Sequence, residues 1–250
     1  GRMIDIHAHI LPGLDDGARD TETALAMAEM AGESGVRTII ATPHCNLPGN
    51  RPNFADETLQ RTFFAFCRSI HNANIPVNIL LGMEIFGTPE VPELLRTGKL
   101  IPLAGSRCPL IEFPFRDYGQ QATEILAGVA ALGFRPIVAH PERYYYVQQS
   151  PELLNRWIEL GCLLQVNKGS LLGRFGPAEE ATALELLDRG FVSFVASDAH
   201  SPIVRTPWMA DVQDLIADEY SPKLARRLLE DNPQTLLDGR DVETAEPEWF

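Results

Sequence analysis

The sequence predicts an α/β fold, a distorted barrel of the (β/α)7 TIM-like type. Two features of the 250 residues lead to this fold class: short apolar runs recur along the chain, and stretches with the apolar spacing of helices separate them. Strands that alternate with helices favour a parallel sheet, and the chain length is typical of a single β/α barrel. Several runs are apolar throughout, as expected for strands covered by helices outside and by packed side chains inside. An open, doubly wound sheet is the alternative.

The predicted elements follow one another in a regular order. The seven predicted strands are MIDIHAHI (3–10), RTIIATPH (37–44), VNILLGMEI (77–85), PLIEFPF (109–115), PIVAHPER (136–143), CLLQVNKGS (162–170) and FVSFVASDAH (191–200). Between them, helical spacing covers residues 21–35 (with Thr21 as a capping-type residue), 53–72, 118–133, 150–161 and 177–190. Two terminal helices are expected within residues 211–219 and 221–237.

The charge and the cysteines exclude several classes of function. A formal net charge of -13 argues against a nucleic-acid binder or a binder of anionic membranes, because both need a basic surface. No apolar run approaches the roughly 18 residues of a membrane span, so no membrane insertion is expected. The four cysteines form no CxxC pair, which favours a protein of the reducing cytoplasm. We expect one domain over residues 3–240 and a loose polar tail over residues 241–250.

Metal-ligating side chains collect where the predicted strands end, and a β/α barrel places its active site at these C-terminal ends. His7 and His9 are two residues apart on the first strand, so both imidazoles point to the same side, and Asp198 and His200 repeat this spacing on the last. Five of the six histidines lie at such points. The nine candidate metal ligands are His7, His9, Asp16, His44, Glu84, Glu112, His140, Asp198 and His200.

These ligand types indicate the metal and the chemistry. Imidazoles and carboxylates without thiolates suit manganese, iron or zinc, and the share of carboxylates favours the harder of these ions. Nine ligands exceed what one ion takes, so two or three divalent ions are expected. Such ions lower the pKa of water far enough to supply a nucleophile at neutral pH.

Basic residues in the strand-end loops could bind the substrate. Arg143 and Arg205 follow ligand candidates closely, and guanidinium groups there can bind phosphate oxygens in a bidentate way, although isolated loop arginines are more often surface charges. The loop GSLLGRFG (169–176), with Lys168 before it and Arg174 within it, could contact the substrate or be only a turn that glycine permits.

Each candidate also has a purely structural interpretation. A single buried histidine is more often a hydrogen-bonded core residue than a metal ligand. The placement of all nine residues at strand ends together makes the metal site the more favoured interpretation. Asp15 is expected only to build a turn and cap the next helix, and His71 to lie on the surface. At least one ring is expected to pack against the barrel rim among Tyr144, Tyr145 and Tyr146.

Seven motifs in order resemble the PHP (polymerase and histidinol phosphatase) superfamily. They are DIHAHILPGLDDGARD, IIATPH, GMEI, LIEFPF, IVAHPER, GSLLGRFG and FVASDAH, and the resemblance runs from Met3 to about Leu237. Within this superfamily, the sequence is similar to the manganese-dependent protein-tyrosine phosphatases of bacterial capsule and exopolysaccharide loci. The resemblance implies a trinuclear site in the PHP fold. It also implies dephosphorylation of the C-terminal tyrosine cluster of bacterial tyrosine kinases that control polymer export.

The same resemblance implies a role for each ligand. It assigns His7, His9, Glu112 and Asp198 to a first ion, Glu112, Glu84 and His140 to a second, and Asp16, His44 and His200 to a third. Arg143 and Arg205 match the phosphate-binding arginines of the family. Many relatives have a second histidine after His44, whereas this chain has Cys45, so the rim of the pocket is expected to differ.

Three other functions remain open from the sequence. A small-molecule phosphoesterase of the histidinol-phosphate phosphatase type would use the same superfamily site. An amidohydrolase also uses an HxH motif and a late aspartate, but it usually needs a bridging lysine where this chain offers Glu112. A metal-stabilised regulatory or kinase-docking module would bind metal without turnover, and it would leave the two arginines without a purpose.

Overall fold

The computed structural model describes residues 1–117 and 119–250, and every predicted strand run contains a strand. The second and third runs are each divided in two, at Pro43 and at Gly82. The strands are β1 (Met3–Ala8), β2 (Val36–Ala41), β3 (His44–Cys45), β4 (Asn78–Leu81), β5 (Glu84–Phe86), β6 (Leu110–Glu112), β7 (Ile137–Ala139), β8 (Leu163–Asn167) and β9 (Phe194–Ala196).

These strands form a distorted parallel barrel. One sheet has the order β1-β2-β4 and the other the order β3-β5-β6-β7-β8-β9. The chain passes from β2 directly into β3 and from β4 directly into β5, so the second sheet continues the first around the barrel. β9 reaches β1 through an isolated bridge between Ala8 and Ala199. Two hydrogen bonds of 2.8 Å support this seam, from His9 N to Ala199 O and from Asp198 N to His7 O. The predicted fold class is confirmed, with an irregular seam between the first and last strands.

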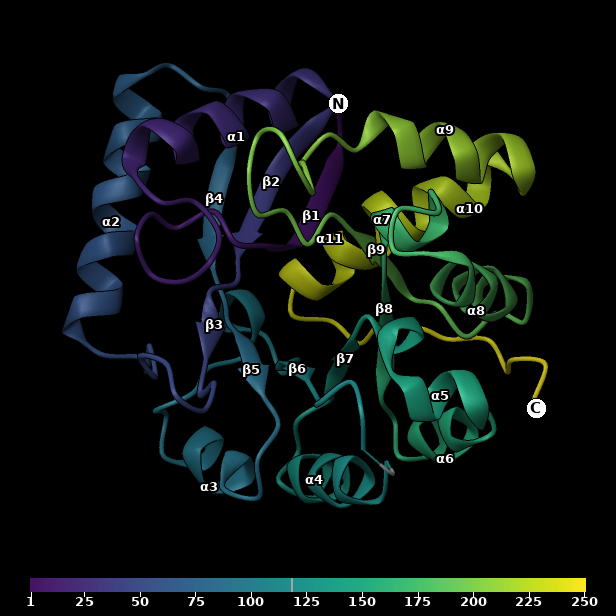
Figure 1. Cartoon of the computed structure of the whole chain (residues 1–250). Coiled ribbons are helices and arrows are strands. Elements are labelled where there is room, and N and C mark those ends of the chain that lie inside the picture. The colour runs from purple at the N-terminus through teal and green to yellow at the C-terminus, as the bar shows by residue number, and fades with distance from the viewer. Residues whose placement is uncertain (118) are drawn as a thin grey trace.

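Helices surround the strands (Figure 1). The predicted ones are α1 (Thr21–Glu33), α2 (Glu57–Asn72), α4 (Gln120–Ala131), α6 (Leu153–Glu159), α8 (Pro177–Asp188) and α9 (Ala210–Glu219), followed by α10 (Pro222–Arg226), the π-helical η3 (Arg227–Asp231) and α11 (Asn232–Leu237). Short α3 (Val91–Arg96), α5 (Tyr145–Gln149) and α7 (Lys168–Leu171), and the turns η1 (Leu103–Gly105) and η2 (Pro141–Arg143), were not predicted. No helix of the described residues is long and apolar enough to cross a membrane.

Two details of the predicted helices change. The N-cap of α1 is Asp20 and not Thr21, because Asp20 Oδ1 accepts a hydrogen bond from Thr23 N at 2.8 Å and Thr21 is already helical. Tyr118, the first residue of the predicted stretch 118–133, lies outside the described residues.

Apolar side chains fill the inside of the barrel. The residues of this interior cluster are Ile4, Ile6, Ile40, Leu103, Cys108, Leu110, Ile137, Ala139, Leu163, Phe194, Ala196, Leu236 and Val242. A larger cluster, which includes Met27 of α1 and Phe66 of α2, lies between the strands and the outer helices. Leu236 of α11 and Val242 close one end of the interior, so the functional side chains have to lie at the other end.

The last ten residues are not the loose tail that the sequence suggested. Val242 is 3% exposed, and its carbonyl oxygen accepts a hydrogen bond from Arg135 Nη1 at 2.5 Å. The ring of Phe250 lies 5.1 Å from that of Phe191, and Asn155 Nδ2 donates to the carbonyl oxygen of Phe250 at 3.1 Å. The prediction failed because single residues dock this segment, and such contacts produce no periodic pattern.

Candidate metal centre

The inside of the barrel changes from apolar to polar along the strands. Residues two apart on a strand share a face, so Glu112 follows Leu110 toward the C-terminal end of β6. On β8, Gln165 and Asn167 follow Leu163 in the same way, and all three are buried. The alternation that fills the lower barrel with apolar side chains therefore brings carboxylates and amides together at its upper end.

One extra residue in β1 brings both of its histidines to this end. Between Asp5 and Ala8, β1 advances by three residues while β2 advances by two, which is the geometry of a β-bulge. A bulge changes which residues face inward, so Ile6 belongs to the interior cluster while the next residue, His7, and then His9 face the polar end. Asp5 Oδ1 accepts a hydrogen bond from His7 N at 3.3 Å, which satisfies an amide of the bulge.

Two ligand candidates have a left-handed backbone, with φ of 35° at His140 and 50° at Asp198. Non-glycine residues rarely adopt this conformation, and where they do the strain often serves a functional site. Ala139 faces the interior cluster, so an extended continuation of β7 would turn the next side chain outward. The left-handed turn instead directs the His140 imidazole inward, where its Nε2 lies 3.0 Å from Glu84 Oε2.

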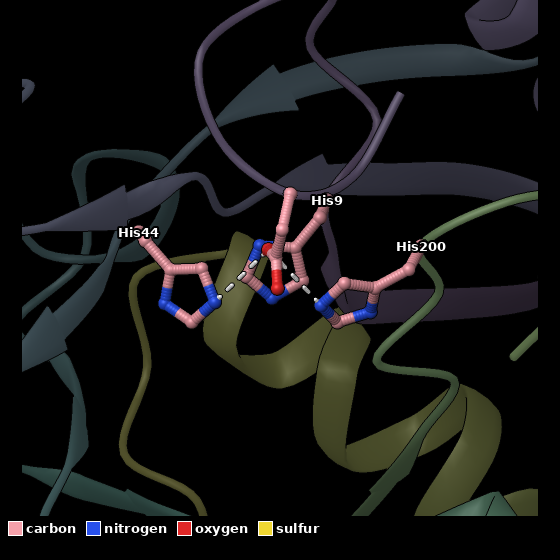
Figure 2. A group of neighbouring side chains, drawn as sticks. His9, His44 and His200 are labelled. Carbon is pink, nitrogen blue, oxygen red and sulfur yellow. Dashed lines mark ion pairs between the residues drawn. The ribbon is translucent and has the colours of Figure 1, made fainter. Parts of the chain in front are cut away.

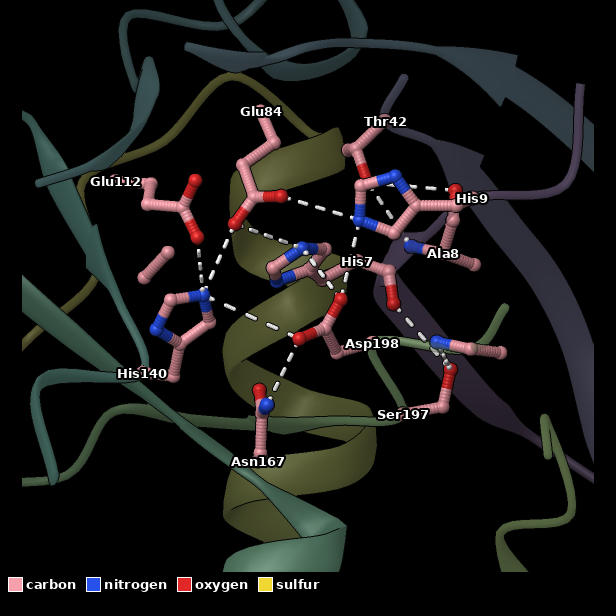
Figure 3. Close-up of polar contacts among 12 residues, drawn as sticks. His7, Ala8, His9, Thr42, Glu84, Glu112, His140, Asn167, Ser197 and Asp198 are labelled. Atoms are coloured by element: carbon pink, nitrogen blue, oxygen red, sulfur yellow. Dashed lines mark hydrogen bonds and ion pairs between the residues drawn. The ribbon is translucent and has the colours of Figure 1, made fainter. Parts of the chain in front are cut away.

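Glu84 lies at the centre of the ligand candidates (Figure 3). Its two oxygens approach four imidazole nitrogens, those of His7 (3.2 Å), His9 (3.1 Å), His44 (3.3 Å) and His140 (3.0 Å). Glu112 contacts only two of these imidazoles, with its oxygens 3.1 Å from His140 Nε2 and 3.9 Å from His44 Nδ1. The bridging role that the resemblance gives to Glu112 stays a prediction, and Glu84 contacts more imidazoles than Glu112 does.

The nine predicted ligands lie in one cluster. Eight of them form three groups whose ligand atoms lie within 4.8 Å of one another: His9, Asp16, His44 and His200; His7, His9, Glu84 and Asp198; and His44, Glu84 and Glu112. The ninth, His140, joins them through its Nε2, 3.0 Å from Glu84 Oε2 and 3.1 Å from Glu112 Oε2. In the first group, His44 and His200 face each other across His9 (Figure 2). Asp16 Oδ1 is 3.4 Å from the Nε2 atoms of His44 and His200, although the Asp16 side chain is 67% exposed.

Hydrogen bonds fix the second ring nitrogen of three histidines. The Nδ1 atoms donate to Gln165 Oε1 (from His7, 2.7 Å), Asp15 Oδ2 (from His9, 2.8 Å) and the carbonyl oxygen of Asp198 (from His200, 2.8 Å). Each of these bonds directs the Nε2 atom of its ring toward the neighbouring carboxylates. When the imidazole is neutral and keeps its proton on Nδ1, its lone pair is on Nε2, which is the tautomer that binds a metal ion, and such contacts hold ligating histidines in orientation.

Asp15 has a role that the sequence did not reveal. It was expected only to build a turn and cap a helix, but besides His9 its carboxylate accepts hydrogen bonds from His44 N at 3.0 Å and Gly17 N at 2.9 Å. It thereby ties two ligand segments together. A pair of aspartates in a turn carries no signal that separates this role from simple turn formation.

The two amides of β8 were also missed. Gln165 Nε2 donates to Asn167 Oδ1 at 2.9 Å, and Asn167 Nδ2 donates to Asp198 Oδ2 at 2.8 Å. Together with the bond from His7 to Gln165, this chain links ligand candidates on β1 and after β9. The available signal was two polar residues at the end of an otherwise apolar strand, LLQVN.

Opposite charges dominate the titration of the cluster. Burial alone would lower the pKa of His7, but Asp198 and Glu84 outweigh it and raise that pKa to about 10. Burial likewise opposes the charge of His140, yet Glu112 and Glu84 raise its pKa to about 9. Burial favours the neutral acids, but His7 and its neighbours hold the pKa values of Glu84 and Asp198 well below their usual range. The carboxylates are therefore ionised at neutral pH, as metal ligands must be.

Several buried polar atoms lack a partner within the described residues. His7 Nε2, His9 Nε2, Glu84 Oε1 and Asp198 Oδ1 are buried without a hydrogen bond of acceptable geometry, although the two Nε2 atoms lie 3.1 Å from Asp198 Oδ1. Leaving a buried polar group unsatisfied is costly, and one explanation of such groups is an ion. Two imidazole nitrogens and two carboxylate oxygens form a suitable donor set for a divalent transition metal, so the residues fit the metal site expected from the sequence.

Both predicted phosphate-binding arginines lie beside this cluster. Arg205 Nη2 donates to Asp198 Oδ2 at 2.6 Å, and Arg143 Nη1 lies 3.9 Å from the same oxygen. Their side chains are 28% and 17% exposed, so both guanidinium groups remain reachable from solvent. The arrangement offers two planar cations at the edge of a cluster of imidazoles and acids.

Cys45 does not form the rim of the site. Its side chain is fully buried, and its Sγ donates to the carbonyl oxygens of Asn53 at 3.1 Å and Pro43 at 3.3 Å. Burial raises the pKa of the Cys45 thiol well above its usual value and that of Cys162 to about 12. The thiol therefore turns away from the site into the core, and the expected difference of the rim from that of the relatives stays a prediction.

The tyrosine run packs as expected. Tyr144 is fully buried, and its hydroxyl donates to the carbonyl oxygen of Ala139 at 2.7 Å and accepts from Phe113 N at 3.0 Å. Tyr146 is 7% exposed and stacks on Tyr144 with centroids 5.5 Å apart, whereas Tyr145 is 56% exposed. His71 is exposed on α2, as predicted.

Comparisons with known proteins agree over nearly the whole chain. The family model of capsular polysaccharide synthesis proteins, CpsB/CapC, matches residues 3–238. The tyrosine-protein phosphatase YwqE of Bacillus subtilis is 35% identical over 242 residues, 96% of this chain and 93% of its own length. The tyrosine-protein phosphatase CpsB of Streptococcus pneumoniae is 31% identical over 240 residues, 94% of this chain and 98% of its own length.

A solved structure extends the likeness to three dimensions. It comes from crystal structures of YwqE from Bacillus subtilis and CpsB from Streptococcus pneumoniae, described as unique metal-dependent tyrosine phosphatases. It has a TM-score of 0.93 and 33% sequence identity, and the match covers 99% of both chains.

Proposed function

Because the chain belongs to the CpsB/CapC family of capsular polysaccharide synthesis proteins, we propose that it is a metal-dependent protein-tyrosine phosphatase. The reaction is the hydrolysis of a phosphoric monoester. The observation that carries the proposal is the cluster of nine ligand candidates with two arginines at its edge, within a fold that matches a metal-dependent tyrosine phosphatase at a TM-score of 0.93.

We assign the nine clustered residues as metal ligands. The three groups of ligand atoms suit two or three ions, with manganese as the first choice and iron or zinc as alternatives. Bound there, the ions supply an activated water at neutral pH and positive charge for the phosphate. The chain's own contribution is to hold His7 and His9 in the metal-binding tautomer through Gln165 and Asp15.

We assign phosphate binding to Arg143 and Arg205. Both guanidinium groups converge on Asp198 Oδ2, so a phosphate above that carboxylate can receive hydrogen bonds from both. These bonds strengthen as negative charge builds up on the equatorial oxygens of the transferring group. The phenol of tyrosine has a pKa of about 10 and leaves with less proton assistance than an alkyl alcohol, so no dedicated general acid is assigned.

Cysteine does not serve as the nucleophile in this proposal. The thiolate is the nucleophilic form, and burial raises the pKa of all four cysteine thiols above the usual value. This separates the chemistry from that of cysteine-dependent tyrosine phosphatases.

The proposed target is a bacterial tyrosine kinase with a C-terminal cluster of phosphotyrosines. The support is the family, whose model describes capsular polysaccharide synthesis. We propose that the phosphatase meets this tail in the cytoplasm. The identity of the target kinase is the most specific part of the proposal. Peptides that carry phosphotyrosine are the first substrates to test.

Turnover with manganese tests the proposal. The protein, loaded with manganese after removal of its own metals, should hydrolyse p-nitrophenyl phosphate and phosphotyrosine peptides, and a chelator should abolish turnover. Vanadate at concentrations that stop cysteine-dependent enzymes should have no effect. Histidinol phosphate in a parallel assay distinguishes the small-molecule phosphoesterase, which would hydrolyse it in preference to the peptide. Elemental analysis should find two or three ions per chain, and absence of turnover on any phosphate ester would contradict the proposal.

A further inference from the structure

One aromatic ring contacts both phosphate-binding arginines. The guanidinium carbon of Arg143 lies 4.2 Å from the ring centroid of Phe175, and that of Arg205 lies 5.3 Å from it. The guanidinium carbon of Arg143 also lies 4.7 Å from the ring centroid of Phe115. A guanidinium group over an aromatic face is attracted by the ring's quadrupole within about 6 Å. Besides Asp198, Phe175 is therefore a side chain that both arginines contact.

The loop 169–176 has the glycines that place this ring. An added Cβ at Gly169 would lie 2.7 Å from Phe175 Cε2, so only glycine leaves room for the ring against the end of β8. Gly173 and Gly176 have φ of 76° and 109°, a region that other residues rarely adopt. These glycines let the chain after α7 turn back so that Phe175 faces Arg143. The motif GSLLGRFG thus builds a specific position for one side chain.

Two basic residues fasten this loop to the loop of Arg205. Lys168, 1% exposed, donates to the carbonyl oxygen of Trp208 and lies 3.4 Å from Asp211 Oδ2. Arg174 Nη2 donates to the same Asp211 oxygen at 3.1 Å. The segments after β8 and after β9, which carry Phe175 and Arg205, are therefore held together by these contacts. Both Lys168 and Arg174 form contacts within the protein, so their charges are explained without a role in binding the substrate.

We infer that Phe175 is a positioning residue for phosphate binding, a shelf that holds the guanidinium planes of Arg143 and Arg205 toward one phosphate. The inference rests on the proposed function. An arginine side chain is flexible, and ordering it costs free energy when the phosphate binds. A ring that stacks on both guanidinium groups orders them beforehand. Its loss should weaken phosphate binding without removing any metal ligand or any hydrogen-bond donor.

The test measures inorganic phosphate binding to the manganese-loaded full chain. Phe175→Leu keeps an apolar side chain and removes the ring, and we expect phosphate to bind about tenfold more weakly, equal to about 1.4 kcal/mol. KM for p-nitrophenyl phosphate should rise, whereas manganese content and the melting temperature should stay near those of the wild type. Phe175→Tyr keeps the ring and should restore phosphate binding. Phe64→Leu, a change of an exposed ring on α2, is the matched control and should have no effect.

A second pair of variants separates positioning from simple packing. In an Arg143→Ala, Arg205→Ala background, Phe175→Leu should cause no further loss of phosphate binding, since the ring acts through the arginines. Gly169→Ala should reproduce the loss, because its methyl group displaces the ring. Unaltered phosphate binding in Phe175→Leu, or an equal further loss in the double-arginine background, overturns the inference. Absence of phosphate-ester turnover in the wild type would instead overturn the proposed function, so the two failures are distinguishable.

Discussion

Asp15→Asn is expected to weaken manganese binding about tenfold and Asp15→Ala about a hundredfold, although Asp15 is not a proposed ligand. Asp15 accepts three hydrogen bonds, from His9 Nδ1, His44 N and Gly17 N. If the asparagine oxygen takes the place of Oδ2, it keeps the bonds from His9 and His44 as weaker neutral bonds and turns its NH2 group toward Gly17 N. The opposite orientation loses the bonds from both His9 and His44. Removing such a contact to a ligating histidine typically costs ten- to hundredfold in affinity, or about 1.4 to 2.7 kcal/mol.

Calorimetric titration of chelator-treated protein with manganese measures this effect. Asp20→Asn is the matched control because it makes the same charge change in the same segment. Asp20 caps α1 and pairs with the exposed Arg19, it contacts no ligand candidate, and asparagine caps a helix equally well. Circular dichroism shows whether each variant is folded. If neither Asp15→Asn nor Asp15→Ala bound manganese more weakly than Asp20→Asn, the idea that Asp15 sets the tautomer and orientation of His9 would have to be abandoned.

Three further predictions address the ligands, the phosphate and the titration of the empty site. Asp198→Ala should remove metal, seen by elemental analysis, and lower turnover by at least about a hundredfold; full metal content would exclude it as a ligand. Arg143→Ala should retain metal but bind phosphate weakly, and unaltered turnover and phosphate inhibition would refute its role. Without metal, His7 and His140 have higher pKa values in the folded protein than the usual 6.5, so their protonation adds to the free energy of unfolding. This contribution is complete below pH 6.5 and is lost as the pH rises through about 9 to 10. Melting temperatures in chelator should fall across that window, and a flat profile would contradict the titration of these imidazoles.

The sequence predicted most of the fold because apolar runs and helical spacing are local signals. Such signals remain visible when an element is interrupted. The run 77–85 predicts one strand, and the structure has two strands there, β4 and β5, on either side of Gly82. Short elements such as α3 and α7 were missed, since four to six residues carry too little periodicity. The docking of Val242 and Phe250 was missed because it depends on tertiary contacts alone.

The ligand candidates were predictable because they stand at strand ends, and the fold gathers strand ends at one place. The residues that orient them were not. Asp15 and Gln165 act through single hydrogen bonds to His9 and His7, and neither spacing nor composition indicates such a partner. The inward turn of His140 depends on a left-handed backbone at a residue type that rarely adopts it, so no sequence rule would place it there.

The seam between β1 and β9 sets the order of assembly during synthesis. Asp5 and Ser197, which are 192 positions apart, bond to each other across it, and His7 and Asp198 meet just above. A nascent chain that has emerged only as far as β8 has its first histidines but lacks Asp198, His200 and Arg205. With the ligands proposed above, high-affinity metal binding would have to follow completion of the barrel, and contacts of such long range make folding comparatively slow. Metal bound there would stabilise the finished barrel and would not direct its early folding.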